Sequence, residues 1–223
     1  SQLKTLILAN MNAGRNECTA LANLLGGTSN MYTLMLTQNG IDDEGVDILV
    51  GGALGNSRLR SLNLSSNQGI TARGWQSLAE LLENPNFNLE RLHLHRNKIG
   101  NEEAHIFANA LTSNRKLKTL DLSWNHITAE GWRGAFSKVL CDASSINNTY
   151  LSNHTLESLG TFEPSSMPAD VASLLALNES SEDKNQIAIK KILKHHQHFN
   201  MQPFLEWDLK VLPLTLNWFE RAR

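Results

Sequence analysis

Residues Leu89–Ile99 read LERLHLHRNKI, and residues Leu117–Ile127 repeat the same arrangement as LKTLDLSWNHI. In both stretches leucine occupies the first, fourth and sixth positions, asparagine the ninth and isoleucine the eleventh. Self-similarity at a fixed spacing indicates a structure built from stacked copies of one unit. Because a unit this short cannot bury its apolar face alone, we expect every copy to add the same element to a shared core.

Six copies of the pattern are found by extending it in both directions, with steps of 28, 28, 30, 28 and 29 residues. Within a copy, one residue separates the second and third apolar residues of the pattern, and this alternation is typical of a half-buried strand. Each copy therefore predicts one short strand of a parallel sheet. The copies begin at Leu3, Met31, Leu59, Leu89, Leu117 and Ile146.

An asparagine follows the strand in four copies, and a helical stripe of apolar residues comes after it. Asparagine carries both a donor and an acceptor, so we expect it to satisfy loop backbone groups rather than to bind a ligand. Thr71, Thr128 and either Asp42 or Asp43 precede helical stripes and are predicted to cap those helices. The asparagines are Asn39, Asn67, Asn97 and Asn125.

The units therefore predict an α/β solenoid, a partial horseshoe with parallel strands on its concave face and helices on its convex face. The sequence is similar to the ribonuclease-inhibitor-like leucine-rich-repeat family, whose repeats carry a full helix and are also found in NOD-like receptors and in the Ran GTPase-activating protein. The resemblance covers roughly residues 3 to 158. The last copy departs from the pattern, with Thr149 at a leucine position and His154 at the asparagine position.

Beyond the repeats the period is lost, and Glu163–Pro168 has the composition of a connector. We divide the chain into a solenoid of six units, residues 1–159, and a helical segment, residues 160–223. Helices are expected near residues 169–178 and 183–199, followed by an apolar stretch from residue 204 to residue 219. Because an open solenoid exposes its last core layer, we interpret this segment as a C-terminal cap, and the alternative is a partner-binding amphipathic segment.

Composition excludes several classes of partner. The formal charge is −2 and neither sign forms a long block, so general affinity for nucleic acid or an anionic membrane is not expected. No apolar run approaches the roughly 20 residues of a membrane span. Cys18 and Cys141 are expected too far apart for a disulfide, which fits a reducing compartment such as the cytoplasm. We expect a monomer unless the chain belongs to a larger assembly. The repeat already begins at Leu3, which suggests a processed chain or a fragment.

The chain lacks the common signatures of catalysis and of cofactor binding. No phosphate-binding loop, dinucleotide-binding glycine motif, His-Glu-x-x-His or Cys-x-x-Cys is present, so we expect neither an enzyme nor a cofactor. His195, His196 and His198 form the one histidine cluster, but no nearby residue supplies the further ligands that zinc needs. We therefore predict no metal site and interpret the histidines as a solvated helix end.

The residues between the inward-pointing leucines face the concave side of the sheet. Neighbouring parallel strands lie about 4.8 Å apart, so His93 and Asp121 are expected side by side. Arginine and aromatic side chains gathered on a rigid surface are typical of interaction hot spots. The candidate partner-binding residues are Met35, Asn63, Arg91, His93, His95, Arg96, Asp121, Trp124 and Tyr150.

The leading hypothesis is an interaction module that binds a protein on this concave face. A solvated sheet face with His93 and Asp121 paired across strands is the simpler alternative. A catalytic His–Asp pair is disfavoured, because no nucleophile is arranged with a glycine-rich turn. The resemblance implies two further alternatives: a regulator of a small GTPase, with Arg91 or Arg96 near the phosphate, or the sensor part of a larger NOD-like receptor.

Overall fold

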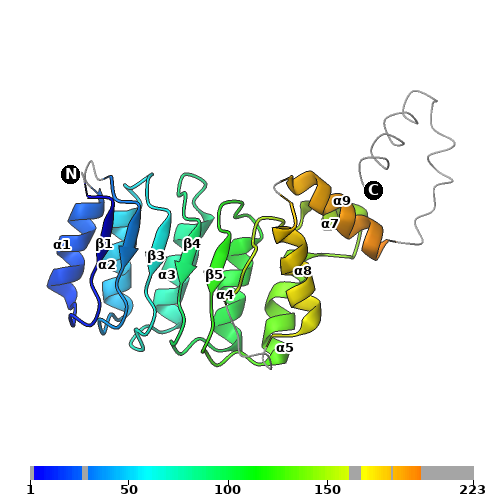
Figure 1. Ribbon diagram of the computed structural model, residues 1–223. Helices are drawn as coiled ribbons and strands as arrows, with labels where there is room; N and C mark the ends of the chain where they lie inside the picture. Colours follow the sequence, from blue (N-terminus) through cyan, green and yellow to red (C-terminus); the bar gives the residue numbers. More distant parts are fainter. Residues whose placement is uncertain (1–2, 27–29, 161–166, 182, 197–223) are drawn as a thin grey trace.

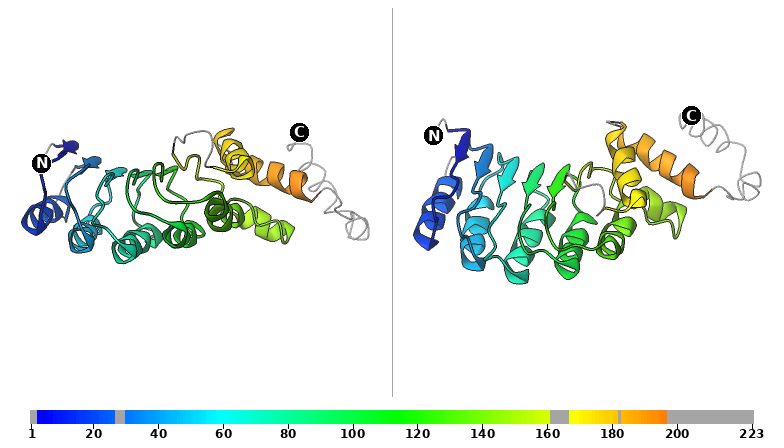
Figure 2. Two further views of the ribbon diagram at one scale, coloured as in Figure 1. Left: turned by 90° about the horizontal axis from the view of Figure 1, so that it is seen from below. Right: turned by 60° about the horizontal axis from the view of Figure 1, so that its bottom comes forward.

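The computed structural model describes residues 3–26, 30–160, 167–181 and 183–196, which form a curved row of strand–helix units (Figure 1). Five strands form one parallel sheet in chain order, and helices cover one of its faces. Figure 2 shows that the row bends gently, with the strands on its inner side. The predicted α/β solenoid is confirmed. The strands are β1 (Thr5–Ile7), β2 (Thr33–Met35), β3 (Ser61–Asn63), β4 (Arg91–His93) and β5 (Thr119–Asp121).

The leucines of successive units are stacked in register along the core. Leu34 pairs with Leu62 and Leu62 with Leu92, and each of these side chains is almost completely buried. Each Å² of apolar surface that is buried stabilises the fold by roughly 25 cal/mol, so each buried leucine stabilises the stack by about 2 kcal/mol. Along the described part of the sheet and its helices, the main contacts join adjacent units, so stability depends on the interfaces between units.

The predicted asparagine ladder is confirmed. Asn67 Oδ1 accepts a hydrogen bond from the backbone nitrogen of Asn39 at 2.9 Å, and Asn97 Oδ1 accepts one from that of Asn67 at 2.7 Å. Asn67 Nδ2 also donates to the backbone oxygens of Leu36 and Leu64, both at 2.9 Å. Each side chain thus satisfies backbone groups of its own unit and of the preceding one, which fixes the loops against each other.

Two of the predicted helix caps are confirmed and one is wrong. Asp42 accepts from the backbone nitrogen of Gly45, and Thr128 accepts from that of Gly131. The side chain of Thr71 makes no capping bond, because Asp43 of the preceding unit accepts from the backbone nitrogen of Gly74 instead. The first four helices are α1 (Arg15–Gly26), α2 (Asp43–Ala53), α3 (Ala72–Glu83) and α4 (Asn101–Leu111), and the fifth unit has α5 (Ala129–Trp132), the π-helical turn η1 (Arg133–Ser137) and α6 (Lys138–Leu140).

Aromatic side chains fill the space between helices on the convex side. Trp75 and Trp132 are buried, as expected for packing residues. The ring centroids of Trp75 and Phe107 are 6.1 Å apart, and those of Trp132 and Phe136 are 5.6 Å apart. Tilted pairs at such distances contribute about 1 kcal/mol beyond the area they bury.

The strand predicted to start at Ile146 is wrong, because this stretch forms helix α7 (Ile146–Leu151). Ser145 caps the helix by accepting from a backbone nitrogen, and a solvated helical turn satisfies the backbone of this polar stretch without a strand partner. The sixth strand position is occupied later in the chain, where the backbone nitrogen of Leu120 donates to the oxygen of Ser158 at 3.0 Å. Leu156 and Leu159 are its buried leucines.

Two further helices lie beside the last repeat: α8 (Ala169–Glu179) and α9 (Lys184–His195). Helix α8 packs on η1 and α6, and helix α9 packs on α7 and α8. The helix predicted near residues 169–178 is confirmed, and α9 lies within the second predicted range. The expected apolar stretch from residue 204 to residue 219 lies outside the described residues. Within the described part of the chain, no helix is both long and apolar enough to span a membrane.

A buried lysine joins α9 to the last repeat. Lys191 is fully buried, and its Nζ donates to the backbone oxygens of Leu140 and Asn153 at 2.6 and 3.3 Å and to His154 Nδ1 at 3.1 Å. His154 Nε2 lies 3.0 Å from the backbone oxygen of Tyr150, so a neutral ring with its proton on Nε2 satisfies both contacts. The three donors of the ammonium group are therefore matched by three acceptors, and none of them is a carboxylate.

Burial shifts the pKa values of this pair. Desolvation lowers the pKa of Lys191 to about 7 against the opposing effect of Cys141, and Lys184 lowers it further. Desolvation and the nearby charge of Lys191 lower the pKa of His154 to about 4. Both groups are thus driven toward their neutral forms when α9 docks.

Candidate functional site

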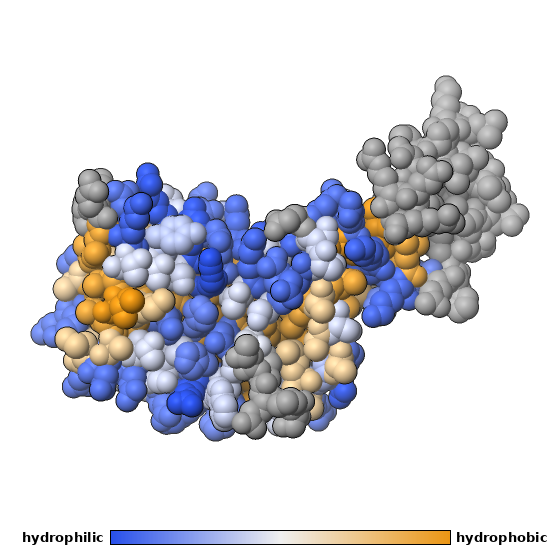
Figure 3. Space-filling model, in the orientation of Figure 1, coloured by the Kyte–Doolittle hydropathy of each residue, from blue (hydrophilic) through white to orange (hydrophobic). Residues whose placement is uncertain are grey.

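The concave face carries one continuous row of side chains, which come from the last residue of each strand. The register pairs Ile7 with Met35, Met35 with Asn63, Asn63 with His93 and His93 with Asp121. The row therefore changes from apolar to polar along the solenoid. Figure 3 shows the same change on this face as an orange area over the first strands and blue and white surfaces farther along.

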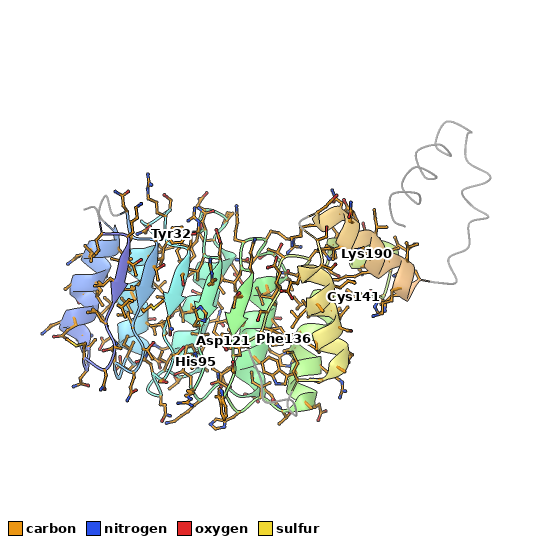
Figure 4. All side chains as sticks on the ribbon, viewed as in Figure 1. Tyr32, His95, Asp121, Phe136, Cys141 and Lys190 are labelled. Carbon is orange, nitrogen blue, oxygen red and sulfur yellow. The ribbon has the colours of Figure 1, made fainter. Side chains whose placement is uncertain are left out.

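At the polar end, two histidines meet one carboxylate. Asp121 Oδ2 lies 3.6 Å from His93 Nδ1 and 3.4 Å from His95 Nδ1. Ser123 donates to Asp121 Oδ1 through its hydroxyl group and through its backbone nitrogen. His95 Nδ1 also lies 2.8 Å from Ser65 Oγ. Figure 4 labels His95 and Asp121, which lie together over β4 and β5.

The contacts of Asp121 favour its ionised form. Its side chain is only 18% exposed, and desolvation alone would raise its pKa. Hydrogen bonds from His93 and Ser123 and the charge of His95 outweigh that effect and lower the pKa below its ordinary value. The carboxylate is therefore held in place inside the cluster, and its stabilising effect is lost only in acid, as pH falls through the lowered pKa.

Arg96 and Trp124 form a second pair at the carboxyl ends of β4 and β5. The Arg96 guanidinium carbon lies 5.5 Å from the centroid of the Trp124 ring, which is a cation–π contact. Trp124 remains 58% exposed. Both residues have φ near +57°, as do Gln38 and Ser66 at the same position of earlier units, and in each of these four units the next residue is an asparagine of the ladder. The pair is thus presented to solvent from a rigid backbone.

The structure brings together most of the predicted site. Arg91, His93, His95, Arg96, Asp121 and Trp124 lie on the last two strands and their loops, and Asn63 and Met35 continue the row toward the first unit. The prediction that Tyr150 lies on the concave row is wrong. It lies on helix α7, where its hydroxyl group is 3.3 Å from Asn185 Oδ1.

Gly160, which the sequence reasoning missed, continues the row in place of Tyr150. A Cβ atom on Gly160 would overlap the side chains of Asp121 and Ser123, and its φ of +108° suits glycine alone. The signal was present in the spacing of Asn153 and Leu156, which repeats that of Asn114 and Leu117. In both pairs the asparagine Oδ1 accepts from the backbone nitrogen of the leucine.

The cluster does not have the geometry of a hydrolytic triad. Ser65 and Asp121 contact the same ring nitrogen of His95, whereas a relay needs the hydroxyl group and the carboxylate on opposite nitrogens. Among the described residues, no group of three or more histidine, cysteine, aspartate or glutamate side chains is suited to hold a metal ion. What the arrangement offers is a rigid surface of cationic, aromatic and hydrogen-bonding groups.

The fold and this surface together define a leucine-rich-repeat solenoid. Residues 55–79, 86–102 and 113–132 match the leucine-rich repeat family. The chain thus belongs to the leucine-rich-repeat proteins, and the helix in each repeat fits the ribonuclease-inhibitor-like kind.

Curated relatives carry the same repeats. Leucine-rich repeat-containing protein 45 of Gallus gallus is 32% identical over 128 residues, which is 56% of this chain and 19% of that protein. NACHT, LRR and PYD domains-containing protein 5 of Mus musculus is 30% identical over 152 residues, which is 68% of this chain and 13% of that protein. The chain therefore spans less than a fifth of the length of these relatives.

Among solved structures, the actin-binding site 2 of leiomodin-1 is similar in fold, with a TM-score of 0.54. The similarity covers 82% of this chain and 97% of that chain, at 16% sequence identity. At this identity the similarity describes the fold alone.

Proposed function

We propose that the chain is a non-catalytic interaction module that binds a protein partner on its concave face. The observation that carries this proposal is the concave patch, defined as Arg91, His93, Arg96 and Trp124. Binding hot spots are enriched in tryptophan and arginine. Here a half-exposed Trp124 stacks on Arg96, and both residues lie on a rigid backbone. Because the repeats hold the patch in place, little conformational entropy is lost when a partner binds.

The cluster around Asp121 supports the patch rather than competing for the partner. Its carboxylate is occupied by His93, His95 and Ser123, so the patch presents the cations of Arg91 and Arg96 outward. We expect the partner to offer an acidic or hydrogen-bond-accepting group beside an apolar one. Cys18 and Cys141 are buried and form no disulfide, which is consistent with a reducing compartment such as the cytoplasm.

The test compares two quadruple alanine variants, one on each face of the solenoid. One replaces the four residues of the concave patch by alanine. The other replaces the exposed convex residues Arg73, Gln76, Glu80 and Glu83 of α3 by alanine. Partners are captured with each protein, identified by mass spectrometry, purified, and titrated in solution.

We expect the dissociation constant of a concave-face partner to rise by about 100-fold or more in the patch variant and to stay unchanged in the convex variant. Circular dichroism and thermal unfolding show whether both variants keep the fold. A partner that binds the folded patch variant as tightly as the natural chain excludes this surface.

A second candidate is supported by the similarity to NACHT, LRR and PYD domains-containing proteins. In this alternative the chain acts as the sensing part of a receptor of that kind, using the same concave face. Its test is whether a purified nucleotide-binding domain from such a receptor binds the chain. Binding that survives both quadruple variants would place the contact elsewhere on the solenoid.

A further inference from the structure

A second charged surface lies at the amino ends of the strands, at the edge of the sheet opposite to the loops that carry Arg96 and Trp124. The backbone nitrogen of Tyr32 donates to the oxygen of Lys4 at 2.7 Å, and that of Arg60 donates to the oxygen of Tyr32 at 2.9 Å. Lys4, Tyr32 and Arg60 are therefore neighbours in one row. Figure 4 labels Tyr32 at the upper edge of the sheet, and His95 and Asp121 lie toward the lower edge.

Arg58, two residues before Arg60 along the chain, lines the same hollow as this row. Leu59 is buried between Arg58 and Arg60, and both arginines thus point away from the core. The same alternation around the buried Met31 places Asn30 beside Tyr32. The surface is hollowed, with a volume of about 460 Å³, and we name it the basic edge: Lys4, Asn30, Tyr32, Arg58 and Arg60.

The cations of the basic edge differ in how firmly they are held. Arg60 donates to the backbone oxygens of Ser57 and Leu59, and its Nε lies 3.3 Å from Glu90 Oε1. Lys4 and Arg58 are exposed to solvent. Arg60 is therefore fixed in position, whereas the exposed side chains of Lys4 and Arg58 can move to reach a ligand.

The concentration of positive charge here is unusual for this chain. The full sequence has 20 lysines and arginines against 22 aspartates and glutamates. Three cations nevertheless line the hollow. Beyond it the same series of backbone hydrogen bonds leads to Glu90, Lys118 and Glu157, where the charges alternate in sign. Positive charge gathered in a hollow attracts a ligand of opposite charge more strongly than scattered charge does.

We infer that the basic edge binds an acidic segment of a polypeptide. Carboxylates pair with guanidinium groups through two parallel hydrogen bonds, and Tyr32, which is 43% exposed, offers a ring for the apolar parts of the segment. The ion pair between Arg60 and Glu90 disfavours a nucleic acid, because it leaves only Lys4 and Arg58 to face a strand that carries a phosphate at every step. A peptide can place its carboxylates beside Lys4 and Arg58 only. This surface is separate from the concave patch, so the inference does not rest on the proposed function.

The experiment uses fluorescence anisotropy with the full chain and a fluorescein-labelled peptide of sequence GESEGESEG. The comparison peptide GQSQGQSQG has the same length without charge. The edge variant carries Lys4→Glu and Arg58→Glu, both at exposed positions. The control variant carries Lys190→Glu and Lys194→Glu on α9, which gives the same net charge far from the basic edge.

We expect the acidic peptide to bind the natural chain and the control variant with similar affinity, and to bind the edge variant at least about ten-fold more weakly. The binding should weaken as salt rises, because exposed charges are screened. Equal binding to the edge and control variants overturns the inference, as does equal binding of the uncharged peptide. A labelled oligothymidylate or a phosphatidylserine vesicle that binds the edge when the acidic peptide does not also overturns it.

Discussion

Replacing Lys191 by methionine should remove a pH dependence of stability that the natural chain possesses. In the folded chain the pKa of Lys191 is lowered to about 7 from its ordinary value of 10.5, because the side chain is buried without a carboxylate partner. Between these two values the unfolded chain binds the proton and the folded chain does not. The free energy of unfolding therefore rises with pH in this window.

The magnitude follows from the proton difference. Each pH unit over which the two states differ by one proton changes the free energy of unfolding by about 1.4 kcal/mol. Between pH 7.0 and 8.5 the folded lysine goes from about half protonated to almost neutral, and the unfolded lysine stays charged. The natural chain should thus gain about 1.5 kcal/mol over this interval.

The interval avoids the other perturbed groups near Lys191. The pKa of His154 is lowered to about 4, so His154 contributes mainly below pH 7. Burial raises the pKa of the Cys141 thiol, so the opposite effect of that group appears only at more alkaline pH. Hydrogen bonds from Ser144 lower the pKa of Asp142, so this carboxylate stays ionised over the interval.

Urea unfolding followed by tryptophan fluorescence at the two pH values measures the effect. We expect the Lys191→Met variant to be within about 1 kcal/mol of the natural chain at pH 7, because a buried charge is often replaced by an apolar side chain without loss. Its stability should change little between pH 7.0 and 8.5. If the natural chain and the variant gain equally over this interval, Lys191 is not the titrating group and the description of its buried contacts is wrong.

The repeat core gives two further predictions. Gly51 and Gly52 are adjacent in α2, but a Cβ on Gly52 would lie 2.5 Å from backbone atoms of Ala22, whereas a Cβ on Gly51 would meet nothing within 4 Å. Gly52→Ala should lower the free energy of unfolding by about 2 kcal/mol and Gly51→Ala should raise it by about 0.5 kcal/mol, as measured by urea unfolding; equal effects would contradict the close approach of α1 and α2. Asn97→Ala removes one acceptor and two backbone-directed donors from the ladder and should cost about 3 kcal/mol in the same assay. A loss below 1 kcal/mol would mean that water replaces the amide group.

Much of the fold was predictable because the fixed spacing of the repeat determines where each strand and loop lies. The spacing of the leucines gave five strands in the correct register, and the asparagine position gave the ladder that joins the loops. The neighbourhood of His93 and Asp121 followed from strand order alone, since equivalent positions of adjacent parallel strands must meet.

The last unit was not predictable from the same pattern. Thr149 and Leu151 have the spacing of two inward strand residues, but they lie in helix α7, whose own hydrogen bonds satisfy their backbone. The segment that pairs with β5 instead begins near Leu156. The choice depends on which stretch completes the core against β5. This is a tertiary contact, which cannot be predicted from the spacing of residues along the chain. For this reason the prediction for Tyr150 is wrong.

The sequence by itself determined the number and order of the first five units, the inward leucines and the row of concave side chains, because each depends on a period along the chain. Only the tertiary structure decided that Ser65 contacts His95, that Arg96 stacks on Trp124, and that Lys191 is buried against the last repeat. The first two contacts depend on side-chain rotamers, which the neighbouring side chains determine. The contacts of Lys191 join residues whose separation along the chain follows no repeat. Periodicity fixes where a backbone lies, whereas the packing of neighbouring units fixes where side chains point and which charges lose their water.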